Sequence, residues 1–133
     1  MECFIVTGHA VDLYDKEVIT TSMGSFFNVN VVRIQENKRL FDLIADFKKR
    51  YPTLKTIGTT AHNEHPIYEL DLSGPVLFMI ETDGLCKAFK DSCDILATIP
   101  MTKTSSATSF NVVCAATVMF YEASRQRYFY YGE

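Results

Sequence analysis

The stretch from Ile99 to Arg127, IPMTKTSSATSFNVVCAATVMFYEASRQR, decides how this chain folds. It begins at the end of a predicted strand and continues through a loop rich in Ser and Thr. We expect a hydroxyl of this loop to cap a helix that begins near Phe110, because Ser and Thr side chains satisfy free backbone N–H groups. From Phe110 to Tyr121 the helix is apolar on nearly every face, which predicts that it is buried. The apolar run is shorter than the roughly 20 residues of a membrane span.

The polar loop makes the N-terminus of this helix a candidate ligand site. Its free N–H groups and the positive end of the helix dipole favour a carboxylate or a phosphate. From this chemistry alone, a capped core helix is the commoner explanation, because caps are universal and ligand sites are few.

Length and composition predict one globular domain. The chain has 133 residues, of which 47% are hydrophobic and 22% charged, and its net charge is −3. This charge argues mildly against a general polyanion binder, although a local basic patch would still serve for nucleic acid. The four cysteines form no C-x-x-C pair, so we interpret them as reduced, mostly buried thiols of a cytoplasmic protein without a metal site or a membrane span.

The alternation of apolar strands and helical segments predicts an α/β fold, with a mostly parallel sheet and helices on both faces. Strands are predicted at residues 3–7, 29–34, 53–60, 75–81 and 94–99, and helices at 16–22, 38–51, 85–90 and from about 110 onward. Asp15 and Asn37 are the expected N-caps of the first two helices. Ligands of such folds bind beyond the carboxyl ends of the strands.

Three blocks of the last stretch stand in a recognisable order: I-P-M at 99–101, S-F-N-V at 109–112, and Y-E followed by R-Q-R at 121–127. A further block, S-M-G-S-x-F, covers residues 22–27. Together they resemble the signatures of the SpoU-type (TrmH-like) RNA 2′-O-ribose methyltransferases of the SPOUT superfamily, over residues 3–127. The resemblance implies a deep trefoil knot, S-adenosylmethionine as the cofactor, ribosomal or transfer RNA as the substrate, and a homodimer formed through the C-terminal helix.

The resemblance also implies a set of site residues. Glu81, Ser109 and Asn111 would have catalytic roles in orienting the reacting groups. The implied cofactor-binding residues are Thr59, Thr60, Met79, Gly84, Leu85, Ile99, Met101 and Phe110. From the residues alone, Glu81 is equally well a carboxylate that caps a turn, and Asn111 a hydrogen-bonding residue of the first helical turn. We expect Glu81, Ile99 and Asn111 to converge in one pocket, because each lies at or beyond the carboxyl end of a strand.

The sequence departs from the family pattern in two places. Met79 and Ile80 stand where the family has Gly–Asn, and a Met side chain in the cofactor's space would cost about 1–3 kcal/mol by overpacking. The family's first strand–helix unit, whose Arg is thought to activate the ribose hydroxyl, has no counterpart before Cys3. The sequence therefore predicts one methyltransferase domain, residues 1–133, that lacks this unit and has no activity alone. A non-catalytic cofactor-binding or dimerisation module of the same fold is the alternative.

Overall fold

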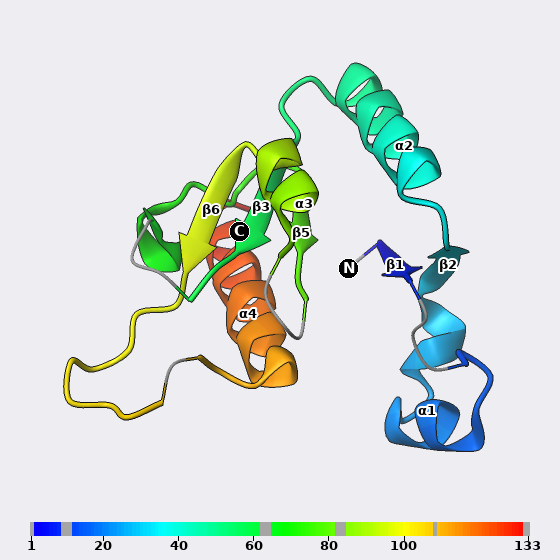
Figure 1. Cartoon of the computed structure of the whole chain (residues 1–133), viewed down its shortest axis with the longest axis horizontal. Coiled ribbons are helices and arrows are strands. Elements are labelled where there is room, and N and C mark those ends of the chain that lie inside the picture. The colour runs from blue at the N-terminus through cyan, green and yellow to red at the C-terminus, as the bar shows by residue number, and fades with distance from the viewer. Residues whose placement is uncertain (1, 9–11, 62–64, 82–84, 108, 132–133) are drawn as a thin grey trace. The chain divides into compact units, whose positions relative to one another are not determined.

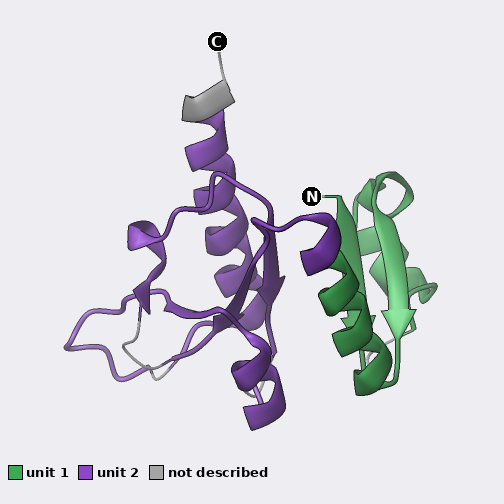
Figure 2. Cartoon of the chain, turned by 90° about the horizontal axis from the view of Figure 1, so that it is seen from above, with its two compact units in different colours: residues 1–47 green, residues 48–133 purple. Residues whose placement is uncertain are grey.

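The chain forms two compact units, residues 1–47 and 48–133, in a computed structural model (Figure 2). The structure describes residues 2–8, 12–61, 65–81, 85–107 and 109–131. The single domain predicted from the length stays a prediction. None of the described helices is long and apolar enough to cross a membrane.

Unit 1 is built around two parallel strands. Strand β1 (Cys3–Thr7) pairs with β2 (Asn30–Ile34), so that Ile5 lies opposite Val32. Between them lie α1 (Lys16–Thr21) and a 3₁₀ helix, η1 (Ser25–Asn28). Asp15 is the N-cap of α1, as predicted, and its carboxylate accepts the Glu17 N–H at 2.8 Å. Helix α2 (Asn37–Arg50) begins one residue earlier than predicted, so Asn37 is its first residue and not its cap.

Unit 2 contains a four-stranded parallel sheet, with the strand order β4–β6–β3–β5 (Figure 1). Its strands are β3 (Lys55–Thr59), β4 (His65–Pro66), β5 (Val76–Met79) and β6 (Ile95–Thr98). Its helices are η2 (Ile67–Glu69), α3 (Lys87–Ser92) and α4 (Val112–Tyr131). The parallel α/β class is confirmed, but the described strands form two sheets where the sequence predicted one. Strand β4 and the two 3₁₀ helices are too short to leave a periodic signal.

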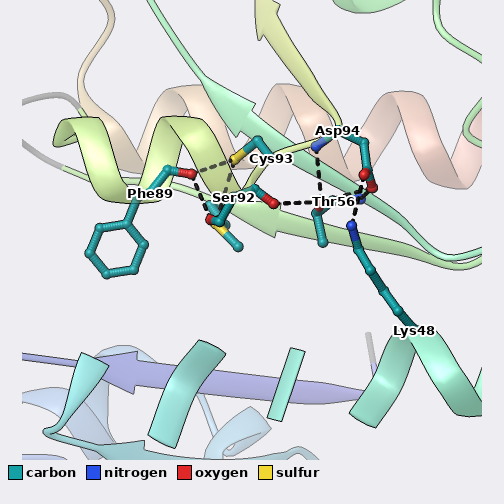
Figure 3. A network of polar contacts seen from close by, with 7 residues as sticks. Lys48, Thr56, Phe89, Ser92, Cys93 and Asp94 are labelled. Atoms are coloured by element: carbon teal, nitrogen blue, oxygen red, sulfur yellow. Dashed lines mark hydrogen bonds and ion pairs between the residues drawn. The ribbon is translucent and has the colours of Figure 1, made fainter. Parts of the chain in front are cut away.

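The two faces of the larger sheet are covered by different helices. Ile57 of β3 and Ala97 of β6 are fully buried in one core with Met119 of α4. The neighbouring Gly58 lies instead against Leu85 and the other side of the sheet. Because side chains alternate along a strand, α3 and α4 cover opposite faces, as the close view in Figure 3 shows. The prediction of helices on both faces is confirmed for this sheet.

Helix α4 runs antiparallel to β5. Phe120 contacts Phe78 in the middle of the strand, with ring centroids 5.9 Å apart, whereas Arg127 bonds to Gly74, ahead of the strand. The N-terminus of α4 therefore lies toward the carboxyl ends of the strands, the direction in which the β6 arrow points in Figure 1. The trefoil knot implied by the resemblance stays a prediction.

Two sequence-based expectations about burial are wrong. Only one face of α4 is covered by the sheet, so Val113 and Tyr121 on its other face are exposed, although the sequence predicted a helix buried all round. Cys3, Cys86 and Cys114 are exposed and only Cys93 is half-buried, so the thiols are not mostly buried. In both cases the exposed side chains lie in apolar stretches of sequence, but no described residue packs over them.

Candidate functional site

The carboxyl ends of three strands meet at one edge of the four-stranded sheet. Gly58 of β3 pairs with Met79 of β5, and Thr59 pairs with Ala97 of β6, so the three strands end in register. The Thr60 N–H donates to the Ala97 carbonyl at 2.9 Å, which extends the β3–β6 pairing by one residue. This edge is the expected place for a ligand of a parallel sheet. We call it the carboxyl edge.

Most of the predicted site residues lie at or just beyond the carboxyl edge. Thr59 and Thr60 follow from β3, Ile99 and Met101 from β6, and all four are half-buried. Glu81 lies two residues beyond β5 and is exposed, so its carboxylate is accessible to a ligand. Gly84 lies outside the described residues. The convergence of Glu81, Ile99 and Asn111 in one pocket stays a prediction.

Asn111 is the cap of α4. Its Oδ1 accepts the Val113 N–H at 2.9 Å, and its carbonyl accepts the Ala115 N–H at 2.9 Å. The expectation that a Ser or Thr of the loop caps this helix is therefore wrong, because the Asn side chain already occupies that place. The bond fixes Asn111 to the helix terminus and uses its oxygen, so the side-chain nitrogen is the group that remains to donate to a ligand. Ser109 and Phe110 precede it and are exposed.

Met79 and Leu85 direct their side chains into the core beneath α3. The Met79 sulfur lies 3.6 Å from the Cys93 Sγ and 3.8 Å from the Ser92 Oγ, and the residue is buried. The side chain thus lies in the protein interior, so the expectation that it would occupy the cofactor's space is wrong. The backbone of Met79, at the carboxyl end of β5, stays the predicted cofactor-binding element.

A network of polar contacts at the opposite end of the sheet fixes the pairing of β3 with β6 (Figure 3). The Asp94 Oδ2 accepts the backbone N–H and the hydroxyl of Thr56, both at 2.8 Å, and its Oδ1 accepts the Lys48 ammonium at 2.7 Å. The Asp94 N–H in turn lies 3.0 Å from the Thr56 hydroxyl oxygen. The network fixes the register in which β3 pairs with β6. It therefore determines which residues of these two strands lie side by side at the carboxyl edge.

Sequence analysis missed this network. Its only local signal is an Asp immediately before a strand, and its Thr partner is 38 residues away in the chain. Cys93 belongs to the same cluster, and its Sγ lies 3.1 Å from the Phe89 carbonyl oxygen. Burial, followed by the nearby Asp94 carboxylate, raises the pKa of the Cys93 thiol to about 11. A thiol with such a pKa is protonated at neutral pH and is a poor nucleophile.

Comparison with known proteins agrees with this arrangement. The family model of the SpoU rRNA Methylase family matches residues 1–121. The chain belongs to the SpoU rRNA methylase family. The resemblance inferred from the sequence blocks is thereby confirmed.

Two kinds of relative extend the match. The 23S rRNA (uridine(2479)-2'-O)-methyltransferase of Streptomyces viridochromogenes is 36% identical over 125 residues, which are 92% of this chain and 43% of the relative. The crystal structure of the SpoU methyltransferase AviRb from the same organism, in complex with the cofactor AdoMet, superposes with a TM-score of 0.85 at 35% identity, over 94% of this chain and 49% of that one. An RNA 2'-O ribose methyltransferase structure gives a TM-score of 0.74 at 32% identity, over 95% and 46% of the two chains. The chain thus spans about half the length of the relatives it matches.

Proposed function

We propose that this chain is the cofactor-binding part of an S-adenosylmethionine-dependent RNA 2′-O-ribose methyltransferase. The observation that carries the proposal is the carboxyl edge, where Thr60, Glu81 and Ile99 follow three adjacent parallel strands of a SpoU-family fold. Ribosomal RNA is the favoured substrate class, because curated relatives of the chain are named as 23S rRNA enzymes; transfer RNA is the alternative. The reaction would take place in the cytoplasm.

Residues of this chain would orient the ribose at the carboxyl edge. S-adenosylmethionine would supply an electrophilic methyl group to the ribose 2′-hydroxyl. The exposed Glu81 carboxylate would accept a hydrogen bond from a ribose hydroxyl, and the Asn111 amide nitrogen would donate one, because its oxygen is held by the Val113 N–H. Two such contacts would align the nucleophile, and alignment alone can account for several orders of magnitude in rate.

The described residues fit the cofactor at this edge. The Met79 side chain is held beneath α3 by Ser92 and Cys93, so it does not extend beyond the end of its strand. Half-buried Ile99 and Met101 and partly exposed Phe110 offer apolar and backbone surface of the kind that lines cofactor sites. We therefore expect the 133-residue chain to bind S-adenosylmethionine.

Calorimetric titration of the full chain with S-adenosylmethionine tests this proposal. Phe110→Ala should weaken binding, whereas Tyr51→Ala should not, because Tyr51 is a similarly exposed aromatic residue (48% against 42%) that precedes β3, at the opposite end of the sheet from the carboxyl edge. Both substitutions are at the surface, so neither should unfold the protein. Absence of binding heat at millimolar cofactor, in a folded sample, would refute the proposal.

We expect no methyl transfer to RNA by this chain alone. The two arginines of α4 are engaged far from the carboxyl edge, Arg125 with Glu122 and Arg127 with the Gly74 carbonyl. The remaining three, Arg33, Arg39 and Arg50, lie on β2 and α2. Among the described residues of unit 2, no arginine lies at the carboxyl ends of β3, β5 or β6, so this unit does not itself supply the arginine that the resemblance implies for activating the hydroxyl.

Incorporation of tritiated methyl groups into total RNA by the purified chain is the direct assay. The informative control is Asn111→Asp, which keeps an oxygen to cap α4 but removes the amide donor. Incorporation by the unsubstituted chain that disappears in Asn111→Asp would show a complete active site and contradict the expected inactivity.

A dimerisation module is the second candidate function. The observation that favours it is the exposed apolar side of α4, where Val113, Val118 and Tyr121 are all at least one-third accessible. Large apolar side chains gathered on one face commonly mark a protein interface. We propose that a second copy of the chain covers this face, in a homodimer that would form whether or not the chain is catalytic.

A further inference from the structure

The side chain of Gln126 on α4 makes two hydrogen bonds to the backbone of the segment 70–74, one on each side of Asp71. Its Nε2 donates to the Leu70 carbonyl at 2.9 Å, and its Oε1 accepts the Leu72 N–H at 2.7 Å. Leu72 is fully buried. An amide with both polar atoms committed to backbone groups beside a core residue holds that backbone in one place, because a shift would leave these groups unsatisfied.

Neighbouring side chains of α4 complete this attachment. The Glu122 carboxylate accepts the Gln126 Nε2 at 2.9 Å, which fixes the orientation of the amide. Arg127 donates to the Gly74 carbonyl at 2.7 Å and to the Leu72 carbonyl at 3.4 Å. Two adjacent helical residues thus satisfy four backbone groups of the segment 70–74.

The segment 70–74 leads directly into β5, so its attachment sets where that strand begins relative to α4. A second contact, between Phe78 and Phe120, lies further along both elements, with ring centroids 5.9 Å apart. Because α4 and β5 run antiparallel, the attachment of the segment 70–74 and the Phe78–Phe120 contact together fix the axial position of the helix relative to the strand.

The same axial position determines where two predicted catalytic residues, Asn111 and Glu81, lie relative to each other. Asn111 lies nine residues of α4 before Phe120, about 13 Å at 1.5 Å per residue. Glu81 lies three residues after Phe78, about 10 Å at 3.3 Å per residue. Both therefore extend beyond the aromatic pair in the same direction, toward the carboxyl edge.

We propose that Gln126 is a positioning residue, which acts from the far end of α4 to set the placement of Asn111 relative to Glu81. The inference rests on the proposed function, because that function assigns Glu81 and Asn111 their catalytic roles. The contacts that Gln126 makes do not depend on those roles. Gln126 touches neither cofactor nor substrate in this role. A misplacement of about 1 Å, caused far from the reacting atoms, can reduce a rate about a hundredfold.

Nuclear magnetic resonance of the full chain tests the proposal. Gln126→Met keeps an unbranched side chain of similar length but removes all three hydrogen bonds. It should shift the backbone amide resonances of both Glu81 and Asn111 in the folded state, at a temperature well below unfolding. Lys38→Met is the control, because it introduces the same residue and removes an exposed side-chain hydrogen bond, to Asp42, without touching α4 or the segment 70–74.

Unchanged Glu81 and Asn111 resonances in a folded Gln126→Met protein would overturn the proposal, because a residue that only stabilises the fold leaves the native state as it was. If Gln126→Met does not fold, Arg127→Met is compared in the same way, since exposed Arg127 bonds only the last part of the segment.

Cofactor affinity provides the second measurement. We expect Gln126→Met to bind S-adenosylmethionine about tenfold more weakly than the unsubstituted chain, and Lys38→Met to bind it equally well. If the unsubstituted chain binds no cofactor, the proposed function fails, and the resonance shifts still decide whether Gln126 positions Asn111 and Glu81.

Discussion

Gly58 of β3 lies where a side chain has no room. A Cβ at this position would lie 2.6 Å from the Leu85 Cδ1, 2.7 Å from the Cys93 Sγ and 2.9 Å from the Leu96 Cδ2. We expect Gly58→Ala to lower the free energy of unfolding by about 1–3 kcal/mol, through overpacking. Urea denaturation measures this difference. Gly74→Ala is the control, because no atom lies within 4 Å of a Cβ there; equal losses in the two variants would contradict the close packing around Gly58.

Asp94 makes stability depend on pH in the acid range. Burial alone would raise the pKa of its carboxyl, but the hydrogen bonds from Lys48 and Thr56 outweigh burial and hold the pKa below its ordinary value of 3.8. A carboxylate whose pKa is lower in the folded state contributes its full stability above the ordinary value, and loses it as the pH falls through the folded value. Asp94→Asn should therefore flatten the loss of stability below about pH 4.

Urea midpoints measured between pH 5 and pH 2 check this expectation. Thr56→Val removes one bond to the carboxylate while keeping the shape of the side chain, so it should move the acid transition upward in pH. Acid transitions that are parallel in the unsubstituted chain and in Asp94→Asn would show that the network carries no pH dependence.

Helix α4 decides the assembly of the molecule at the scale of elements. Val113, Thr117 and Tyr121 are four residues apart and exposed, so they form one stripe along the helix. If this stripe is the seam of a homodimer, Val113→Lys combined with Tyr121→Lys should give a monomer, because two buried charges without partners cost several kcal/mol. Light scattering of the unsubstituted and substituted chains measures the mass.

Asp42→Lys is the matched control for the dimer. It changes the net charge by the same two units, at an exposed position of α2 whose ion pair with Lys38 is open to solvent. We expect it to leave the mass unchanged. A monomer in the unsubstituted chain at high concentration would exclude the dimer.

At the scale of the whole molecule, the two units differ in how much core they contain. The buried apolar residues of unit 1 are Leu40 and Ile44 alone among those described, whereas unit 2 buries Ile57, Leu72 and Met119 completely or nearly so. Small units with little core open easily. We therefore expect amide hydrogens of β1 and β2 to exchange with solvent at least about tenfold faster than those of β3 and β6. Equal protection in native-state exchange would show that the units open together.

The sequence alone determined the order of elements, the parallel class and the family. These features depend on local information, since apolar periodicity identifies strands and helices, and motif blocks need only order and spacing. The strand ends followed from the same pattern, and the expectation that Glu81, Ile99 and Asn111 converge in one pocket depends on it; that convergence stays a prediction. Asp15 was identified as a cap for the same reason, because a cap acts within its own first turn.

The tertiary structure decided which faces are covered and which distant groups bond. The apolar sequence of α4 predicts a buried helix, but the four-stranded sheet covers only one side of it. Whether Met79 fills a ligand's space or the core depends on what α3 places beside it. The Asp94–Thr56 and Gln126–Leu70 contacts join residues 38 and 56 positions apart. No local pattern encodes such a pair, because its geometry exists only once the strands and helices between the two residues have packed.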